Sequence, residues 1–199
     1  MYRSVFFRFC AAVLLLLGGV AFAQDADSRK EDRQQLLTIL AEIERGINEV
    51  NIDLMAKHFD EKATVTWLNA EVSHGPEGVR SYFKRMVGSE PDAVLSKYVT
   101  HPKIGQSTQF YGDVAVANGT TEDEFTPHRR GPFNFHTVWT ATLIKREGNW
   151  KIISLTLSTN TFNNVLIDEL KQYAVYAGIG GTLLGMLLVT AWCYLRRKA

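Results

Sequence analysis

The segment between residues 24 and 171 contains no cysteine, because the only two in the chain are Cys10 and Cys193. A disulfide, a thiol nucleophile and a cysteine-ligated metal are therefore excluded from that segment. The five histidines show no ligand spacing such as H-x-x-x-H. We expect neither a metal site nor another cofactor.

Charge is missing from two apolar segments at the ends of the chain. Residues 1–23 carry Arg3 and Arg8, then an apolar run and an Ala-Phe-Ala ending, a pattern typical of a cleaved signal peptide. The alternative is an uncleaved anchor, although the run is short for a membrane span. Residues 172–195 have no charge, and the basic tail 196–199 follows them. This predicts a transmembrane helix whose C-terminus is cytoplasmic.

The part between these ends has no excess of positive charge. It holds all 21 acidic residues and 17 of the 22 basic ones, a net charge of about −4. Such a surface gives no electrostatic reason to bind nucleic acid. The two ends together predict a single-pass protein of a bacterial inner membrane, with its soluble domain in the periplasm.

Hydrophobic periodicity predicts an α+β domain in residues 30–162, after a disordered mature N-terminus at 24–29. Helices are expected over 28–50, over 51–59 with Asn51 or Asp53 as N-cap, and over 75–88. Strands are expected over 63–69, 94–101, 106–111, 113–125, 133–146 and 150–161. Helices followed by an antiparallel sheet are an α+β layout. A juxtamembrane helix is expected over 163–171.

Four short motifs in this order carry a resemblance to a known superfamily. They are "NIDLMAKHFDEKATVTW", "HGPEGVRSYF", "YGDVAVANGTTEDEF" and "TATLIKREGNWKIISLTLS". The chain resembles the nuclear transport factor 2-like superfamily, especially its SnoaL-like and calcium/calmodulin-dependent kinase association-domain branches. The resemblance implies a cone-shaped domain whose curved sheet wraps helices around an apolar pocket. It implies no single function, because this fold hosts both enzymes and non-catalytic domains.

The catalytic positions that the resemblance implies are occupied by unreactive side chains. Where isomerases of this superfamily have a general-base Asp and an oxyanion-stabilising Tyr, this chain has Trp67 and Ile43. Where the SnoaL-like branch often has a His in the last strand, this chain has Thr156. We therefore expect no catalytic residue. The alternative is an enzyme of cyclase, dehydratase or isomerase type that uses Asp123 with His136.

The last two strands are expected to form one wall of the pocket. A hairpin turning at Gly148 and Asn149 would place Thr156 opposite Ala141 and Ser158 opposite Trp139. The ligand-binding residues that we predict are Trp67, Phe83, Trp139, Thr156 and Ser158, although ordinary core packing would also explain the aromatic ones.

The opposite face of these strands is expected to be apolar. It would carry Val138, Thr140, Thr142, Ile144, Ile153, Leu155 and Leu157. A sheet that is apolar on both faces predicts that a second subunit covers one of them. Ala177, Gly181 and Gly185 recur at a spacing that lets two membrane helices approach closely, although glycine is common in such helices anyway.

The sequence therefore predicts a membrane-anchored, exported module that binds a small apolar ligand or another protein. It is expected to be a homodimer and not to bind nucleic acid. Two alternatives remain open at this point. One is the enzyme described above, and the other is a structural dimerisation partner of a membrane complex.

Overall fold

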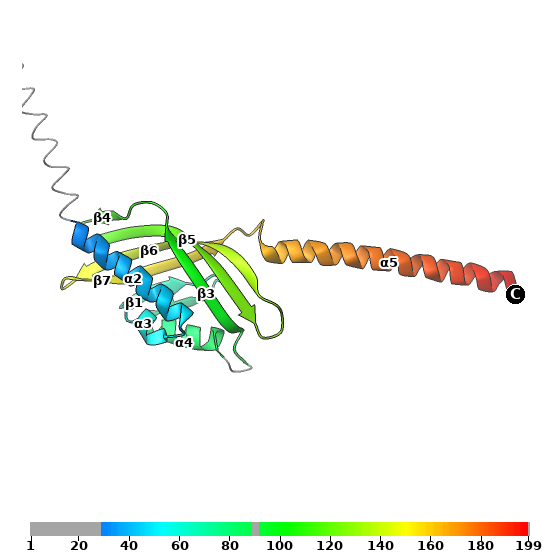
Figure 1. Ribbon diagram of the computed structural model, residues 1–199, viewed down its shortest axis with the longest axis horizontal. Coiled ribbons are helices and arrows are strands. Elements are labelled where there is room, and N and C mark those ends of the chain that lie inside the picture. Colours follow the sequence, from blue (N-terminus) through cyan, green and yellow to red (C-terminus); the bar gives the residue numbers. More distant parts are fainter. Residues whose placement is uncertain (1–28, 89–91, 199) are drawn as a thin grey trace, which may run out of the picture.

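A computed structural model of the chain describes residues 29–88 and 92–198 (Figure 1). The predicted signal peptide at 1–23 lies outside these residues, and so do residues 24–28 of the predicted mature N-terminus. The helices are α2 (Lys30–Asn48), α3 (Ile52–Ala56), α4 (Gly75–Met86) and α5 (Val165–Lys198). The three helices expected over 28–50, 51–59 and 75–88 are confirmed, each with shorter bounds.

Local chemistry explains where these helices begin. The Asn51 side chain accepts a hydrogen bond of 3.1 Å from the backbone N–H of Leu54, so Asn51 rather than Asp53 is the N-cap of α3. Gly75 opens α4 with φ of 62°, and a side chain there would press against the Glu61 carbonyl oxygen. Pro76 follows in the first turn, where a missing N–H costs nothing.

The sheet has seven strands in the order β2-β1-β7-β6-β5-β3, with β4 paired to β5. Their bounds are β1 (Phe59–Thr66), β2 (Val72–His74), β3 (Leu95–Ile104), β4 (Gln109–Tyr111), β5 (Val114–Pro127), β6 (Phe133–Arg146) and β7 (Asn149–Thr159). The expected antiparallel sheet is wrong in one respect, because β1 pairs with β7 in parallel. The short strand β2 was not predicted.

The curved sheet wraps around the helices of the N-terminal half. Figure 1 shows α2 crossing the concave side of the sheet, with α3 and α4 below it. The core lies between them and is built from apolar side chains of both layers, among them Ile47, Phe59, Val65, Val79, Phe83 and Ile152. Burying one such side chain stabilises the fold by roughly 2 kcal/mol.

The pairing of β6 with β7 differs from the expected register. The turn residues are Glu147 and Gly148, both with positive φ, which is the geometry of a tight two-residue hairpin. Leu143 pairs with Ile152 but Thr142 pairs with Ser154, so Ile153 is an extra residue. A one-residue bulge moves every later side chain of the strand to the other face.

This bulge overturns the expected facing of the hydroxyl-bearing residues of β7. Ala141 pairs with Leu155 and Trp139 with Leu157, whereas Thr156 pairs with Thr140. Thr156 and Ser158 are exposed on the outer face of the sheet. The expectation that Leu155 and Leu157 lie on that outer face was therefore wrong.

One buried carboxylate fastens the beginning of α2 to the β6–β7 hairpin. Asp32 Oδ1 accepts hydrogen bonds from Lys145 Nζ at 2.7 Å and Trp150 Nε1 at 3.0 Å, and Oδ2 accepts one from Arg29 at 2.9 Å. Only 4% of Asp32 is exposed. Burial raises the pKa of Asp32, but the three donors outweigh it and lower the pKa to about 2. The charged carboxylate thus stabilises the position of α2 over the sheet.

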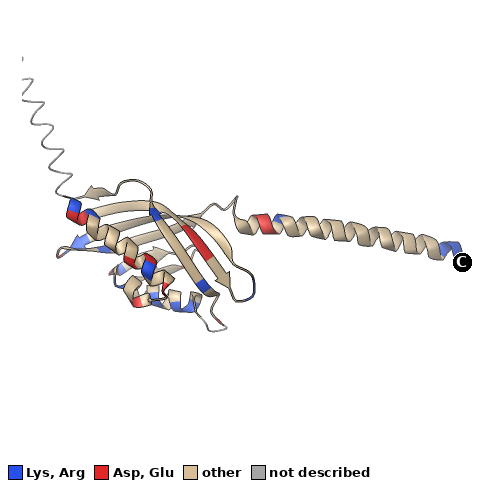
Figure 2. Ribbon diagram, viewed as in Figure 1, with Lys and Arg blue, Asp and Glu red and all other residues tan. Residues whose placement is uncertain are grey.

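The C-terminal helix α5 projects away from the domain (Figure 1), and none of its residues is buried. It is one continuous helix across the expected juxtamembrane and transmembrane segments. Its length and composition are sufficient to cross a membrane. Figure 2 shows the middle of α5 free of charged residues, with Arg196, Arg197 and Lys198 in its last turn. Arg130 of the β5–β6 loop pairs with Glu169 near its start, at 2.7 Å.

We predict that Asp32→Asn lowers the free energy of unfolding by about 2 kcal/mol at pH 7, because the amide cannot accept from all three donors. In the native chain the contribution of Asp32 is complete above about pH 5 and disappears as the pH falls toward 2, through the folded-state pKa. Denaturant unfolding at several pH values measures both effects. Asp53→Asn is the control, because Asp53 is exposed and its change should stay below about 0.5 kcal/mol. Equal losses for the two variants would contradict the role of Asp32.

Candidate functional site: an apolar cavity inside the sheet

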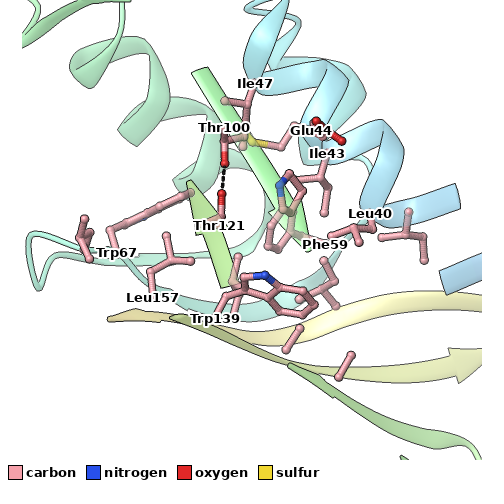
Figure 3. A pocket seen from close by; sticks show the side chains of 18 of the residues that line it. Leu40, Ile43, Glu44, Ile47, Phe59, Trp67, Thr100, Thr121, Trp139 and Leu157 are labelled. Carbon is pink, nitrogen blue, oxygen red and sulfur yellow. Dashed lines mark hydrogen bonds between the residues drawn. The ribbon is translucent and has the colours of Figure 1, made fainter. Parts of the chain in front are cut away.

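A cavity of about 350 Å³ lies between α2, α4 and the concave face of the sheet (Figure 3). Its wall is mostly apolar, because the inward positions of α2 and of the strands carry aliphatic and aromatic side chains. These include Leu36, Leu40, Ile43, Ile47, Met55, Phe59, Leu143 and Ile152. A cavity of this size and character is suited to a small apolar molecule.

Three of the five residues predicted to bind a ligand line this cavity, namely Trp67, Phe83 and Trp139. Thr156 and Ser158 do not line it, because the bulge at Ile153 turns them outward. Leu155 and Leu157 line the cavity in their places. The β7 part of the wall is therefore aliphatic, whereas a hydroxyl-bearing wall was expected.

Trp139 owes its position in the wall to a glycine on the neighbouring strand. Gly119 pairs with Trp139, and a Cβ atom at Gly119 would lie 2.6 Å from the indole ring. The indole N–H donates to the Thr120 carbonyl oxygen at 3.2 Å. Because Gly119 has no side chain, the indole ring lies against the backbone of β5, and this leaves space on the cavity side of the ring.

One end of the cavity is formed by two stacked aromatic rings. Trp67 and Tyr82 lie with their centroids 4.2 Å apart and their planes 3° apart. The Trp67 indole N–H donates to Ser73 Oγ at 2.8 Å, and the Tyr82 hydroxyl donates to Asn69 Oδ1 at 3.3 Å. Burial, and then the charge of Glu71, raises the pKa of Tyr82 to about 12. Tyr82 is thus a neutral wall residue at physiological pH.

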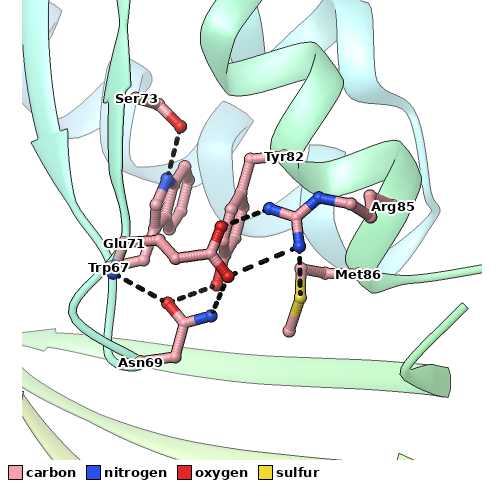
Figure 4. A network of polar contacts seen from close by, with 7 residues as sticks. All are labelled: Trp67, Asn69, Glu71, Ser73, Tyr82, Arg85 and Met86. Carbon is pink, nitrogen blue, oxygen red and sulfur yellow. Dashed lines mark hydrogen bonds and ion pairs between the residues drawn. The ribbon is translucent and has the colours of Figure 1, made fainter.

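An ion pair lies over this stack at the surface. Arg85 binds Glu71, and Asn69 also donates to Glu71 at 2.7 Å (Figure 4). The guanidinium of Arg85 lies 5.6 Å from the centre of the Tyr82 ring, within the range of a cation–π contact. These polar contacts hold the stack in place from outside.

A second, polar end is built by inward residues of β3 and β5. Asp123 is 2% exposed, and its Oδ1 is within hydrogen-bond distance of Thr100 Oγ1 (2.7 Å), Tyr98 Oη (3.0 Å) and Thr121 Oγ1 (3.1 Å). Thr100 and Thr121 also line the cavity, and their hydroxyl oxygens lie 2.6 Å apart. Burial, and then the charge of Asp123, holds the pKa of Tyr98 well above its usual value near 10, so its hydroxyl keeps its proton.

The alternative catalytic pair of Asp123 with His136 does not form. Asp123 points into the domain, whereas His136 is exposed on the outer face and its Nδ1 lies 2.9 Å from Glu122 Oε1. The strand alternation explains this, since Glu122 pairs with His136 and the next residue, Asp123, faces the other side. The alternative in which these two residues act together was therefore wrong.

The cavity opens between α2 and the segment that joins β3 to β4. Leu37 and Ile104 line it and are 45% and 42% exposed. Arg33 donates to Ser107 Oγ at 3.0 Å and to the Thr108 carbonyl oxygen at 3.3 Å, which ties α2 to the opposite rim. A rim with two exposed apolar residues is suited to admit an apolar molecule.

Several of the cavity residues were not predicted from the sequence. The residues of the wall that were missed are Tyr82, Tyr98, Thr100 and Thr121. Buried and exposed residues alternate along β5, and this alternation places Thr121 and Asp123 on the inner face of the strand. Trp67 and Ile43, at the positions where isomerases of the resembled superfamily carry catalytic groups, both line the cavity. Within residues 29–88 and 92–198, no three His, Cys, Asp or Glu side chains are grouped so that they could hold a metal ion.

Comparison with known proteins finds structural relatives only. No protein-family model and no curated protein matches the sequence. A hexachlorocyclohexane dehydrochlorinase from Novosphingobium barchaimii has a similar structure, with a TM-score of 0.59 and 16% identity over 69% of this chain and 92% of that one. A structure described as a scytalone dehydratase from Novosphingobium aromaticivorans gives 0.59 and 13% identity, covering 68% of this chain and 89% of that one.

A third structure is described as a dehydratase of the NTF2-like family, from Streptomyces avermitilis. It matches with a TM-score of 0.53 and 13% identity, over 65% of this chain and 97% of that one. At identities this low, the likeness shows a shared fold alone. The domain that precedes α5 therefore has the nuclear transport factor 2-like fold, as the sequence motifs predicted.

Proposed function

We propose that this protein is a membrane-anchored binding module whose cavity takes up a small apolar molecule. The observation that carries the proposal is the cavity itself. It has about 350 Å³ of space, a mostly aliphatic and aromatic wall, and an opening flanked by exposed Leu37 and Ile104. Transfer of an apolar ligand from water into a cavity of this kind is favourable, because apolar surface of both ligand and wall is removed from water.

The wall favours binding over catalysis. Proton abstraction needs a base within reach of the substrate and a donor for the developing oxyanion. Trp67 and Ile43 supply neither, and Asp123 is engaged by three hydroxyls behind the wall. The alternative is an enzyme like the dehydratases and dehydrochlorinase that share the fold, with Asp123 as its acid. That alternative requires a ligand that reaches past Thr100 and Thr121.

We also propose that α5 anchors the protein in a bacterial inner membrane, with the cavity domain in the periplasm. The support is its uncharged middle, its lack of buried residues and the basic residues of its last turn. Tyr173, Tyr176, Trp192 and Tyr194 lie near the two ends of this apolar stretch, where aromatic residues favour the membrane interface.

A homodimer is proposed as the working form, with the outer face of the sheet as the interface. The register places Thr66, Thr156, Thr140 and Asn118 in one row across four strands, with Thr64, Ser154 and Thr142 in the next row. Val138 is 45% exposed beside them. Short hydroxyl-bearing side chains leave this face flat, so that a second copy can pack on it.

We predict that Ala141→Phe abolishes binding of the neutral fluorescent probe N-phenyl-1-naphthylamine, because a large side chain on the inner face of β6 fills the cavity. Asn134→Phe is the matched control, since Asn134 is an exposed outer-face residue of the same strand and lies outside the two rows of the proposed interface. Probe fluorescence on the purified full chain measures the affinity, and a loss of more than tenfold is expected for Ala141→Phe alone. Equal binding by the native chain and Ala141→Phe would refute the proposed cavity.

The membrane topology is tested with single cysteines in a background that carries both Cys10→Ser and Cys193→Ser. Asn149→Cys, at the exposed β6–β7 turn, should react with a membrane-impermeant maleimide in intact spheroplasts. Ala199→Cys should react only after the membrane is broken. The reverse pattern, or release of the protein from membranes by carbonate, would contradict the proposed anchor.

Thr140→Arg should separate the proposed dimer, because it places two like charges against the partner copy at the centre of the outer face. Sedimentation of the full chain in detergent measures the number of copies, and Glu49→Arg on the exposed end of α2 is the control. A native chain that sediments as a monomer at all concentrations would remove the dimer from the account.

A further inference from the structure

The two threonines at the polar end of the cavity face each other from neighbouring strands. Figure 3 shows Thr100 and Thr121 at one end of the space, with their hydroxyl groups in contact. They are 4% and 5% exposed, so water outside the domain does not compete for them. The other polar lining groups, such as Arg33, Glu44 and Ser107, belong to the opening. A ligand that lies deep in the cavity therefore meets Thr100 and Thr121 with its polar group.

The direction of the hydrogen bonds at this end follows from counting protons. Each hydroxyl has one proton to donate and two lone pairs that accept. The Tyr98 proton goes to Asp123 Oδ1, and each threonine proton goes either to Asp123 or to the other threonine. In every arrangement the protons are used inside the cluster, because the carboxylate only accepts. The threonine oxygens thus present lone pairs to the cavity.

A further buried hydroxyl lies beside the same cluster. Thr137 pairs with Thr121 across β5 and β6, and it is 1% exposed. Its Oγ1 has no hydrogen-bond partner among the described residues. Buried polar atoms without a partner are costly, but Thr137 does not line the cavity, so a ligand there reaches Thr100 and Thr121 and not Thr137.

The charge behind the threonines restricts the ligand further. Asp123 forms no ion pair with a described Lys, Arg or His side chain, so its negative charge is balanced only by hydroxyl dipoles. A carboxylate ligand would meet both this charge and the lone pairs. An ether or ketone would find no donor. An ammonium group would lose its hydration without touching the carboxylate, which does not line the cavity.

We propose that the cavity selects an apolar molecule bearing a neutral hydroxyl group, such as a phenol or a long-chain or polycyclic alcohol, whose O–H donates to Thr100 or Thr121. This inference rests on the proposed ligand-binding function and assigns the Asp123 cluster the role of setting the polarity of the site.

The test compares four probes with one ring system, namely naphthalene, 2-naphthol, 2-methoxynaphthalene and 2-naphthoate. Equilibrium dialysis against the full chain in lipid nanodiscs measures each Kd, with empty nanodiscs as the blank for partition into lipid. We expect 2-naphthol to bind at least about tenfold more tightly than either substituted analogue, since one buried hydrogen bond contributes about that factor.

Variants decide which group sets this preference. In Asp123→Asn the amide can donate to the threonines, which frees their protons, so the preference for 2-naphthol over 2-methoxynaphthalene should fall below about threefold. Thr121→Val tests the same site with one acceptor removed and with little change of volume. Glu122→Gln is the control, because Glu122 is the next residue on β5 but lies on the outer face, and its preference should stay native. Thermal unfolding establishes that each variant is folded.

The outcomes separate this inference from the proposed function. Tight binding of naphthalene with equal affinity for its three derivatives, or strongest binding of 2-naphthoate, would overturn the selectivity and leave the cavity as a binding site. A full preference for 2-naphthol in both Asp123→Asn and Thr121→Val would overturn the role of the cluster. Binding of none of the four probes would overturn the proposed function, and the inference with it.

Discussion

The arrangement of the domain depends on one buried carboxylate, Asp32. Its bonds to Lys145 and Trp150 fasten the first turn of α2 to the β6–β7 hairpin. The helix is tied at its other end by Asn48, which exchanges hydrogen bonds with the backbone of Thr100 at 2.8 and 3.0 Å. A helix held at both ends across a curved sheet cannot sink onto it, so space remains between the two layers. The cavity is thus a consequence of polar contacts at its margins.

The bulge at Ile153 divides the sheet into two chemically different faces. Without the extra residue, Thr156 and Ser158 would point into the cavity and Leu155 and Leu157 would lie outside. With it, the inner face of β7 is aliphatic and the outer face carries rows of hydroxyls. The cavity consequently has its hydrogen-bonding groups at one end only, on β3 and β5. The polarity of a bound molecule is then set by Thr100 and Thr121, with Asp123 behind them.

The sequence was sufficient for the layout and for the aromatic part of the wall. Apolar residues at helical spacing located α2 and α4, and alternation located β5 and β6, because these periods follow directly from backbone geometry. Trp67, Phe83 and Trp139 were correctly placed on the inner side. The bulge at Ile153 was missed, although the apolar residues of β7 change from even positions before it (Trp150, Ile152) to odd positions after it (Leu155, Leu157). The parallel pairing of β1 with β7 and the meeting of Tyr98 with Asp123 depend on contacts between distant segments, which a single sequence does not reveal.

The measurement that tests the account most directly is native mass spectrometry of the full chain, released from gently extracted membranes. We expect a bound small molecule that is apolar, carries a hydroxyl group and is lost in Ala141→Phe but not in Asn134→Phe. A chain that carries no small molecule under any gentle condition, together with an identical spectrum for Ala141→Phe, would contradict the account. The cavity would then be space between packed layers, and the function would lie on the outer face of the sheet.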